Sequence, residues 1–146
     1  MSLQEKLQAD LKDALRSKDE MKLSTLRFLM ASIHNLKIEK GKLDNEDIVT
    51  TIQKQIKQRK ESIEGFQQGG RDELVKKEKT EMEILQTYLP EQLSSVEVEN
   101  IVDSAIKEAS ASSPQDMGKV MGILSSKLKG KADMGVVSGV VSKKLS

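Results

Sequence analysis

The spacing of apolar residues constrains this chain more than any other feature. From the first residues to the last they recur at intervals of three and four, the period of an amphipathic helix, and nowhere do they alternate over the length of a strand. The pattern therefore predicts an all-α protein. Glycines, prolines and capping residues separate the expected helices, which cover approximately 3–17, 20–40, 45–67, 71–88, 95–109, 114–128 and 133–145.

A proline near the middle of the chain predicts a division into two units. Pro90 disfavours a helical residue before it, so the fourth helix has to end there. Ser94 and Glu97 then match a capping box, a common start of a helix. We expect an N-terminal domain of about four helices at 1–90 and a C-terminal three-helix domain at 91–146, with no internal repeat. The second domain is close to the lower size limit for an independent core.

The composition excludes several classes of protein. The chain has no cysteine, which removes disulfide scaffolds, thiolate zinc sites and thiol nucleophiles and fits a reducing, cytoplasmic location. No apolar run approaches the ~20 residues of a membrane span, and residues 1–5 open an amphipathic helix instead of a signal peptide, so we expect no association with membranes. The formal net charge of +1 provides no general attraction to nucleic acid, and no DNA partner is expected.

The sequence also lacks the motifs of known catalytic sites. His34 is the only histidine, and we interpret it as a residue of the core or its rim that bonds to a neighbouring carboxylate or carbonyl. The carboxylates lack metal-ligand spacing, and the glycines stand within helices and at their ends instead of in phosphate-binding loops. We therefore expect no catalytic residue, no metal and no cofactor.

One charged residue falls within an apolar stripe. Arg59 shares the inner face of the third helix with residues such as Ile56, while Glu78 and Glu81 share the apolar face of the fourth helix. Because the two helices form a hairpin that turns at paired glycines, both glutamates lie within one turn of the level of Arg59. We predict an ion pair from Arg59 to Glu81, or to Glu78, that sets the register of the hairpin. A catalytic role for these residues is the less favoured alternative.

Small residues recur on one side of each of the last two helices. Gly118 and Gly122 share a face of the sixth helix, and Gly135 and Gly139 face away from the valines of the seventh. Each glycine inside a helix costs ~1 kcal/mol relative to alanine, so these positions imply a need for close approach of another backbone. Tight packing of the protein's own helices is one explanation. A smooth surface for an RNA backbone or for a partner helix is the other.

Lysines border these glycines. Between residues 115 and 146 six lysines stand against two acids, a local excess of four positive charges: Lys119, Lys127, Lys129, Lys131, Lys143 and Lys144. Clustered lysines bind phosphates by releasing counterions, although solvated lysines are also ordinary on helix surfaces. Only 2% of the residues are aromatic, so platforms for base stacking are lacking, and any RNA would be bound through its shape and backbone.

Four blocks of sequence together resemble the GatB/YqeY family. The resemblance covers nearly the whole chain, and four separated blocks in the right order carry it: QRKESI at 58–63, YLPEQLS at 88–94, MGKVMG at 117–122 and KGKAD at 129–133. The resemblance implies a free-standing YqeY-like protein with a helical N-terminal unit. It further implies a three-helix C-terminal unit like the tail domain of the B subunit of glutamine-dependent aminoacyl-tRNA amidotransferases. Met134 departs from the family, in which a glycine is frequent at this position.

The resemblance also implies a role at tRNA, because that tail domain helps to hold the tRNA body. Including Lys127 from the local charge, the positions assigned to nucleic-acid contact are Gly118, Lys119, Gly122, Lys127, Lys129, Gly130 and Lys131. A carbon–nitrogen ligase activity with glutamine as amido-N-donor is implied only by association with the pathway, since the chain lacks the catalytic body of the subunit.

Three functions are compatible with these observations. The first is a non-enzymatic accessory that binds tRNA, or the tRNA-amidotransferase machinery, through its C-terminal unit. The second is a protein–protein adaptor whose glycine-rich helix faces receive a partner helix. Binding through phosphates weakens steeply with salt, whereas docking of a helix on a smooth face hardly changes, so salt dependence distinguishes the two. An amide-bond enzyme that acts alone is the least favoured.

Overall fold

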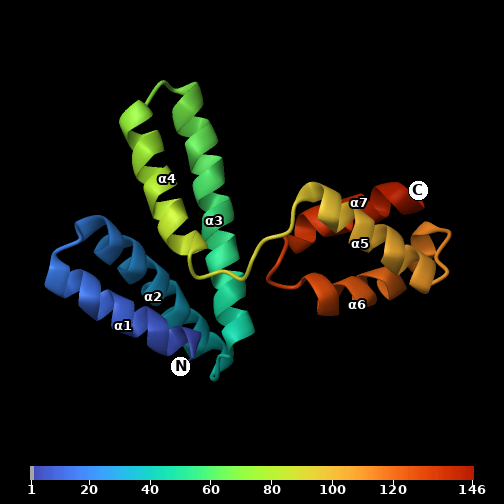
Figure 1. Ribbon diagram of the computed structural model, residues 1–146, viewed down its shortest axis with the longest axis horizontal. Coiled ribbons are helices and arrows are strands. Elements are labelled where there is room, and N and C mark those ends of the chain that lie inside the picture. The colour runs from blue at the N-terminus through green and yellow to red at the C-terminus, as the bar shows by residue number, and fades with distance from the viewer. Residues whose placement is uncertain (1) are drawn as a thin grey trace. The chain divides into compact units, whose positions relative to one another are not determined.

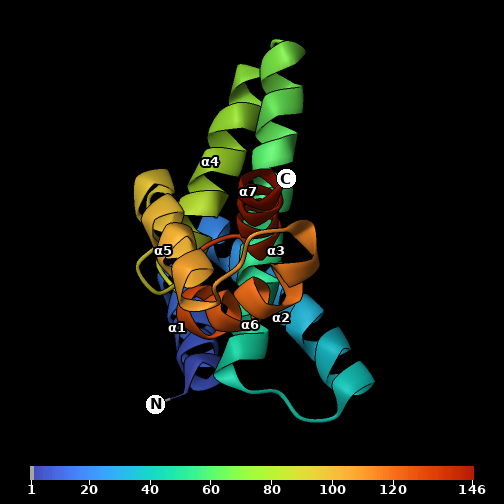
Figure 2. The ribbon, with the colours of Figure 1, turned by 90° about the vertical axis from the view of Figure 1, so that its right-hand side faces the viewer.

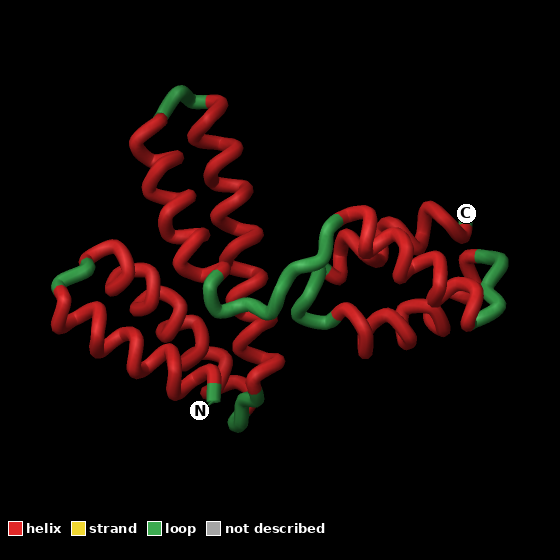
Figure 3. Tube along the Cα trace, in the orientation of Figure 1, coloured by secondary structure: helices red, strands yellow, loops and turns green. Residues whose placement is uncertain are grey.

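The computed structural model describes residues 2–146, and these form an all-α protein (Figures 1 and 3). The predicted fold class is confirmed, because the described residues contain helices and short connections but no strand. In chain order the helices are α1 (Leu3–Ser17), α2 (Glu20–Lys40), α3 (Asn45–Gln68), α4 (Asp72–Gln86), α5 (Ser95–Glu108), α6 (Met117–Leu128) and α7 (Met134–Leu145). A 3₁₀ turn, η1 (Pro114–Asp116), precedes α6.

Two helix boundaries differ from the expected ones by more than one residue, and both lie near a proline. α4 ends at Gln86, and the chain continues toward Pro90 in a tighter turn, in which the Leu89 amide donates to the Gln86 carbonyl at 3.2 Å. The helix expected from residue 114 begins as η1 instead. There the Asp116 carboxylate accepts from the amides of Ser112 and Ser113, at 2.9 and 3.3 Å, and these bonds lower the pKa of Asp116.

The chain divides into two compact units, Met1–Leu89 and Pro90–Ser146. Each unit has a hydrophobic core of its own. The core of the first unit is formed by Leu7, Leu26, Leu29, Ile33, Ile48, Ile52, Ile56, Leu85 and Tyr88.

The first unit is built from two helical hairpins. α1 pairs with α2 and α3 pairs with α4, and α3 and α4 lie side by side in both ribbon views (Figures 1 and 2). α2 contacts both helices of the second hairpin. Gly70, with a φ of 68°, makes the left-handed turn between α3 and α4, a conformation that glycine adopts without steric cost.

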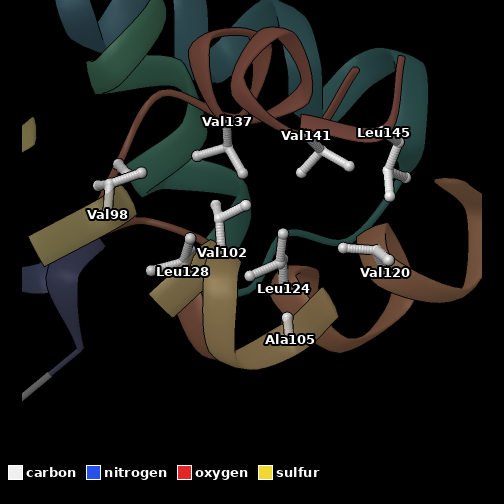
Figure 4. Close-up of a cluster of buried hydrophobic side chains, with 10 residues drawn as sticks. Val98, Val102, Ala105, Val120, Leu124, Leu128, Val137, Val141 and Leu145 are labelled. Carbon is white, nitrogen blue, oxygen red and sulfur yellow. The ribbon is translucent and has the colours of Figure 1, made fainter. Parts of the chain in front are cut away.

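The second unit packs α5, α6 and α7 around one core (Figure 4). Each helix contributes a stripe of small and medium apolar residues at helical spacing, which lets the three helices approach closely. The core residues are Val98, Val102, Ala105, Val120, Leu124, Leu128, Ala132, Val137, Val141 and Leu145.

The helices α6 and α7 are two copies of one sequence pattern. Residues 116–128 read DMGKVMGILSSKL and residues 133–145 read DMGVVSGVVSKKL. Both helices have 12 residues, and each buries three residues spaced four apart, Val120, Leu124 and Leu128 in α6 and Val137, Val141 and Leu145 in α7. The expectation that the chain has no internal repeat is therefore wrong. Apolar spacing does not reveal the recurrence, because five of the eight identical positions are aspartate, glycine, serine or lysine.

Candidate nucleic-acid interface

The repeated glycines lie on the outer faces of α6 and α7. Gly118, Gly122, Gly135 and Gly139 are all exposed, opposite the buried stripe of their helices. A Cβ atom placed on Gly118, Gly122 or Gly139 would meet nothing within 4 Å among the described residues. Tight packing of the protein's own helices therefore does not account for these three glycines. Each lowers the stability of its helix without an internal contact to compensate.

The lysines around these faces fall into two groups. Lys127 and Lys144 occupy the same position in the two copies of the repeat, and both turn toward acidic residues of α5. Lys127 Nζ lies 3.3 Å from Glu108. Lys144 Nζ lies 2.8 Å from Asp103 and 3.2 Å from Glu99, and its hydrogen bonds to these carboxylates raise its pKa. Lys127 therefore links α6 to α5, and Lys144 links α7 to α5. Part of the charge of both lysines is neutralised within the unit.

The second group of lysines points to solvent. Lys119, Lys129, Lys131 and Lys143 are exposed, and Lys119 interacts electrostatically with Asp116. Within residues 2–146 no acid forms an ion pair with Lys131 or with Lys143. The ammonium groups of Lys131 and Lys143 are therefore the part of the charge cluster that remains available to an external anion.

The turn between α6 and α7 positions two of these lysines. Gly130 is buried with a φ of 84°, so glycine is needed here for the turn itself and not for the approach of a ligand. The amides of Lys131 and Ala132 both donate to the Leu128 carbonyl, at 2.9 and 3.2 Å. α7 then begins at Met134, and the carboxylate of the preceding N-cap residue, Asp133, accepts from the Gly135 amide at 2.8 Å.

Sequence reasoning missed one set of contacts at this turn. Gln92 Nε2 donates to the Gly130 carbonyl at 2.7 Å, and the Leu93 amide donates to the Lys131 carbonyl at 3.0 Å. The block YLPEQLS and the block KGKAD, which the sequence shows far apart, are therefore bonded to each other. Their joint presence in a family pattern was the only signal that could have paired them.

Arg59 forms a separate polar cluster in the first unit. Arg59 Nη1 donates to Glu78 Oε2 at 3.0 Å and also to Glu81 Oε2. The side chains are 11% exposed for Arg59 and 8% for Glu81, against 21% for Glu78, so the bond to Glu81 is the most shielded from water. The predicted contact thus involves both glutamates, which clamp the guanidinium between α3 and α4.

α2 covers this cluster from the other side. The guanidinium carbon of Arg59 lies 5.8 Å from the ring centre of Phe28. One turn earlier in α3 and one turn later in α2, Gln55 Nε2 donates to Ser32 Oγ at 2.8 Å. The cluster therefore joins three helices of the unit. It presents no nucleophile and no unpaired carboxylate of Glu78 or Glu81, which supports a structural role.

Three further expectations concern metal ligands, the single histidine and membrane spans. No group of three or more metal-ligating side chains occurs in the described part of the chain. His34 is exposed, so the prediction of a residue held in the core or its rim does not fit its position. Over residues 2–146 no helix has both the length and the apolar character that a membrane span requires.

Comparison with known proteins gives a match over nearly the full chain. A family model described as Yqey-like protein matches residues 4–145. Curated relatives carry the name "Altered inheritance of mitochondria protein 41, mitochondrial". The protein from Pyrenophora tritici-repentis is 39% identical over 130 residues, which cover 87% of this chain and 71% of the relative.

Two further relatives of the same name share shorter segments. The protein from Eremothecium gossypii is 42% identical over 85 residues, 57% of this chain and 46% of the relative. The protein from Lachancea thermotolerans is 37% identical over 112 residues, 74% of this chain and 60% of the relative. The chain thus spans about half to seven tenths of the relatives it matches.

The names of these relatives contradict the expected cytoplasmic location. All three are named as mitochondrial proteins. The expectation was wrong because it depended on the absence of cysteine, which argues against an oxidising compartment but does not distinguish one reducing compartment from another.

Proposed function

The chain belongs to the Yqey-like protein family, and from this premise we propose that its C-terminal unit binds tRNA as a non-enzymatic accessory, alone or with the tRNA-amidotransferase machinery. The observation that carries the proposal is the pair of open glycine faces on α6 and α7, bordered by exposed lysines. Bare backbone lets a phosphodiester chain come close, and ammonium groups beside it neutralise the phosphates.

The distribution of charge supports this surface over others in the unit. Residues 90–146 contain seven lysines and seven acids, so the unit is neutral, yet five of the acids belong to α5 and the segment before it. α6, α7 and the turn between them carry six of the lysines, of which Lys127 and Lys144 pair with acids of α5. The other four add positive charge to the part of the unit that also carries the glycines, and this charge supports the binding of an anion there.

The chemistry of the chain supports binding and not catalysis. Phosphate contacts fix the position of a nucleic acid without reading its sequence, and lysines are suited to them as point charges. Residues 90–146 contain no aromatic residue, so this unit offers bases no aromatic side chain to stack on. We therefore assign recognition to the shape and backbone of a folded RNA.

A titration of the protein with tRNA tests the proposal. Affinity measured from about 50 to 200 mM salt should fall with a logarithmic slope of roughly 0.7 to 0.9 for each phosphate contact. The variant Lys119→Gln/Lys131→Gln should lower that slope by roughly 1.4 to 1.8. Lys107 is an exposed residue of α5 in the same unit, so Lys107→Gln is the matched control and should leave the slope unchanged. Absence of tRNA binding at low salt would refute the proposal.

One observation favours a second candidate, an adaptor that receives a partner helix. Val136 stands at the repeat position of Lys119 and is 61% exposed, beside Gly135. The outer face of α7 is thus smoother and more apolar than that of α6. Binding of a protein partner that persists at high salt and is lost in Val136→Lys would support the adaptor in place of tRNA.

A further inference from the structure

The segment that opens the second unit is bonded to the basic turn between α6 and α7. Gln92 Nε2 donates both to the Gly130 carbonyl at 2.7 Å and to the Pro90 carbonyl at 2.8 Å, so both hydrogens of its amide are used. Leu93 adds a backbone bond to the Lys131 carbonyl at 3.0 Å, and its side chain packs against the core of the unit.

The turn depends on these outside donors for part of its hydrogen bonding. α6 ends at Leu128, and the carbonyls that follow a helix end have no partner within the helix. The Leu128 carbonyl accepts from the amides of Lys131 and Ala132, whereas the carbonyls of Gly130 and Lys131 accept from Gln92 and Leu93. The backbone that carries the exposed Lys131 is therefore fixed from inside and from outside the turn.

We propose that Gln92 is a positioning residue that clamps this turn, so that the lysines on it leave the backbone in a fixed direction. The clamp itself follows from the hydrogen bonds above. Its consequence for ligand binding rests on the proposed function, since a fixed ammonium loses less freedom when it meets a phosphate than one on a mobile turn. Gln92 touches no ligand in this scheme and acts through Gly130.

Hydrogen exchange in the full-length chain tests the clamp without any ligand. Gln92→Met keeps the length and the neutral charge of the side chain but removes both donors. The amides of Lys131 and Ala132 should then exchange about five- to tenfold faster, the loss expected for one hydrogen bond. Gln115→Met, on the exposed part of η1, is the control and should leave these rates unchanged. Unchanged exchange in Gln92→Met overturns the proposal.

The unmodified protein provides a second readout that does not depend on a variant. The Leu93 amide should show protection similar to that of the Lys131 amide, because the two bonds close the same turn. A Leu93 amide that exchanges like an unstructured chain would overturn the clamp even if Gln92→Met failed to fold.

Binding of tRNA separates the clamp from the proposed function. Gln92→Met should bind tRNA about five- to tenfold more weakly with an unchanged salt slope, because no lysine is lost. Lys131→Gln should lower the slope instead. If the unmodified protein does not bind tRNA, the proposed function fails while the exchange experiment still decides on the clamp. Equal affinity of Gln92→Met and the unmodified protein for tRNA would overturn the positioning role.

Discussion

At the scale of the residue, Arg59 joins α3 and α4 through two carboxylates and lies under the ring of Phe28. Removing one partner of a buried pair leaves the other charge without compensation, which costs far more than the pair contributes when intact. Glu81 is the more deeply buried of the two glutamates, and it should therefore be the more sensitive position.

The variant Glu81→Gln should lower the free energy of unfolding of the first unit by about 2 to 3 kcal/mol. Lys77, 57% exposed and 4.0 Å from Glu81, supplies the matched control, and Lys77→Gln should cost at most about 0.5 kcal/mol. Tyr88 is the only tyrosine in a chain without tryptophan, so its fluorescence reports the unfolding of its own unit. Equal effects of the two substitutions would contradict the assignment.

The raised pKa of the Tyr88 phenol predicts a loss of stability at alkaline pH. Burial, and then its 2.6 Å hydrogen bond to Asp10, raise the pKa of its phenol above the ordinary value of about 10. As the pH passes about 10, the unfolded chain releases this proton while the folded chain keeps it, so stability falls with rising pH. Tyr88→Phe should remove this part of the decline. The check is the unfolding midpoint in urea as a function of pH, and parallel profiles for the two proteins would disprove it.

Residues differ in how far the sequence predicts their partners. The sequence predicts Arg59 near Glu78 and Glu81, because the glycine turn between α3 and α4 sets the register of the hairpin that carries all three. Tyr88 and Asp10 are separated by 78 positions, and no local pattern connects them. The same holds for Gln92 and Gly130, whose contact depends on the packing of the whole second unit.

At the scale of the element, the helices α6 and α7 keep glycines that their own packing does not require. Gly122 and Gly139 have open space where a Cβ would stand, so alanine at both positions should stabilise the second unit by about 1 kcal/mol each. Circular dichroism during thermal unfolding measures the gain. Gly130→Ala is the contrasting control and should destabilise the unit, because its φ of 84° disfavours any side chain. Destabilisation by alanine at Gly122 would show a hidden internal contact.

Helix existence followed from apolar spacing, but helix ends and the repeat did not. The end of α4 and the start of α6 lie beside prolines, where the chain tightens into 3₁₀ turns that apolar spacing does not indicate. The repeat includes glycines and lysines on the outer faces of α6 and α7. Their shared positions become apparent only when the buried and the outer faces of both helices are known.

At the scale of the whole molecule, the two units contain separate cores and should fold separately. All buried residues of the second core come from residues 98–145, and none from the first unit. A fragment of residues 90–146 should therefore be helical and unfold cooperatively, with the low stability expected of its size. Far-ultraviolet circular dichroism of the fragment checks this. A fragment that is unfolded in buffer would show that the second unit depends on the first.

The sequence predicts the family and the fold class correctly, whereas the location that it predicts is wrong. Four blocks in order pointed to the family, and the helical period to the fold. Location depends on targeting, which composition does not encode, and the names of the relatives corrected it.

The proposed binding of tRNA requires that the outer faces of α6 and α7 are kept bare for an external macromolecule. The direct test is the affinity of Gly122→Leu/Gly139→Leu for tRNA, measured beside its thermal stability. A Cβ at either position meets no atom within 4 Å, so stability should be kept while the affinity falls at least about tenfold, the effect of losing roughly 1.4 kcal/mol of contact. A stable variant that binds tRNA as tightly as the unmodified protein would contradict the account.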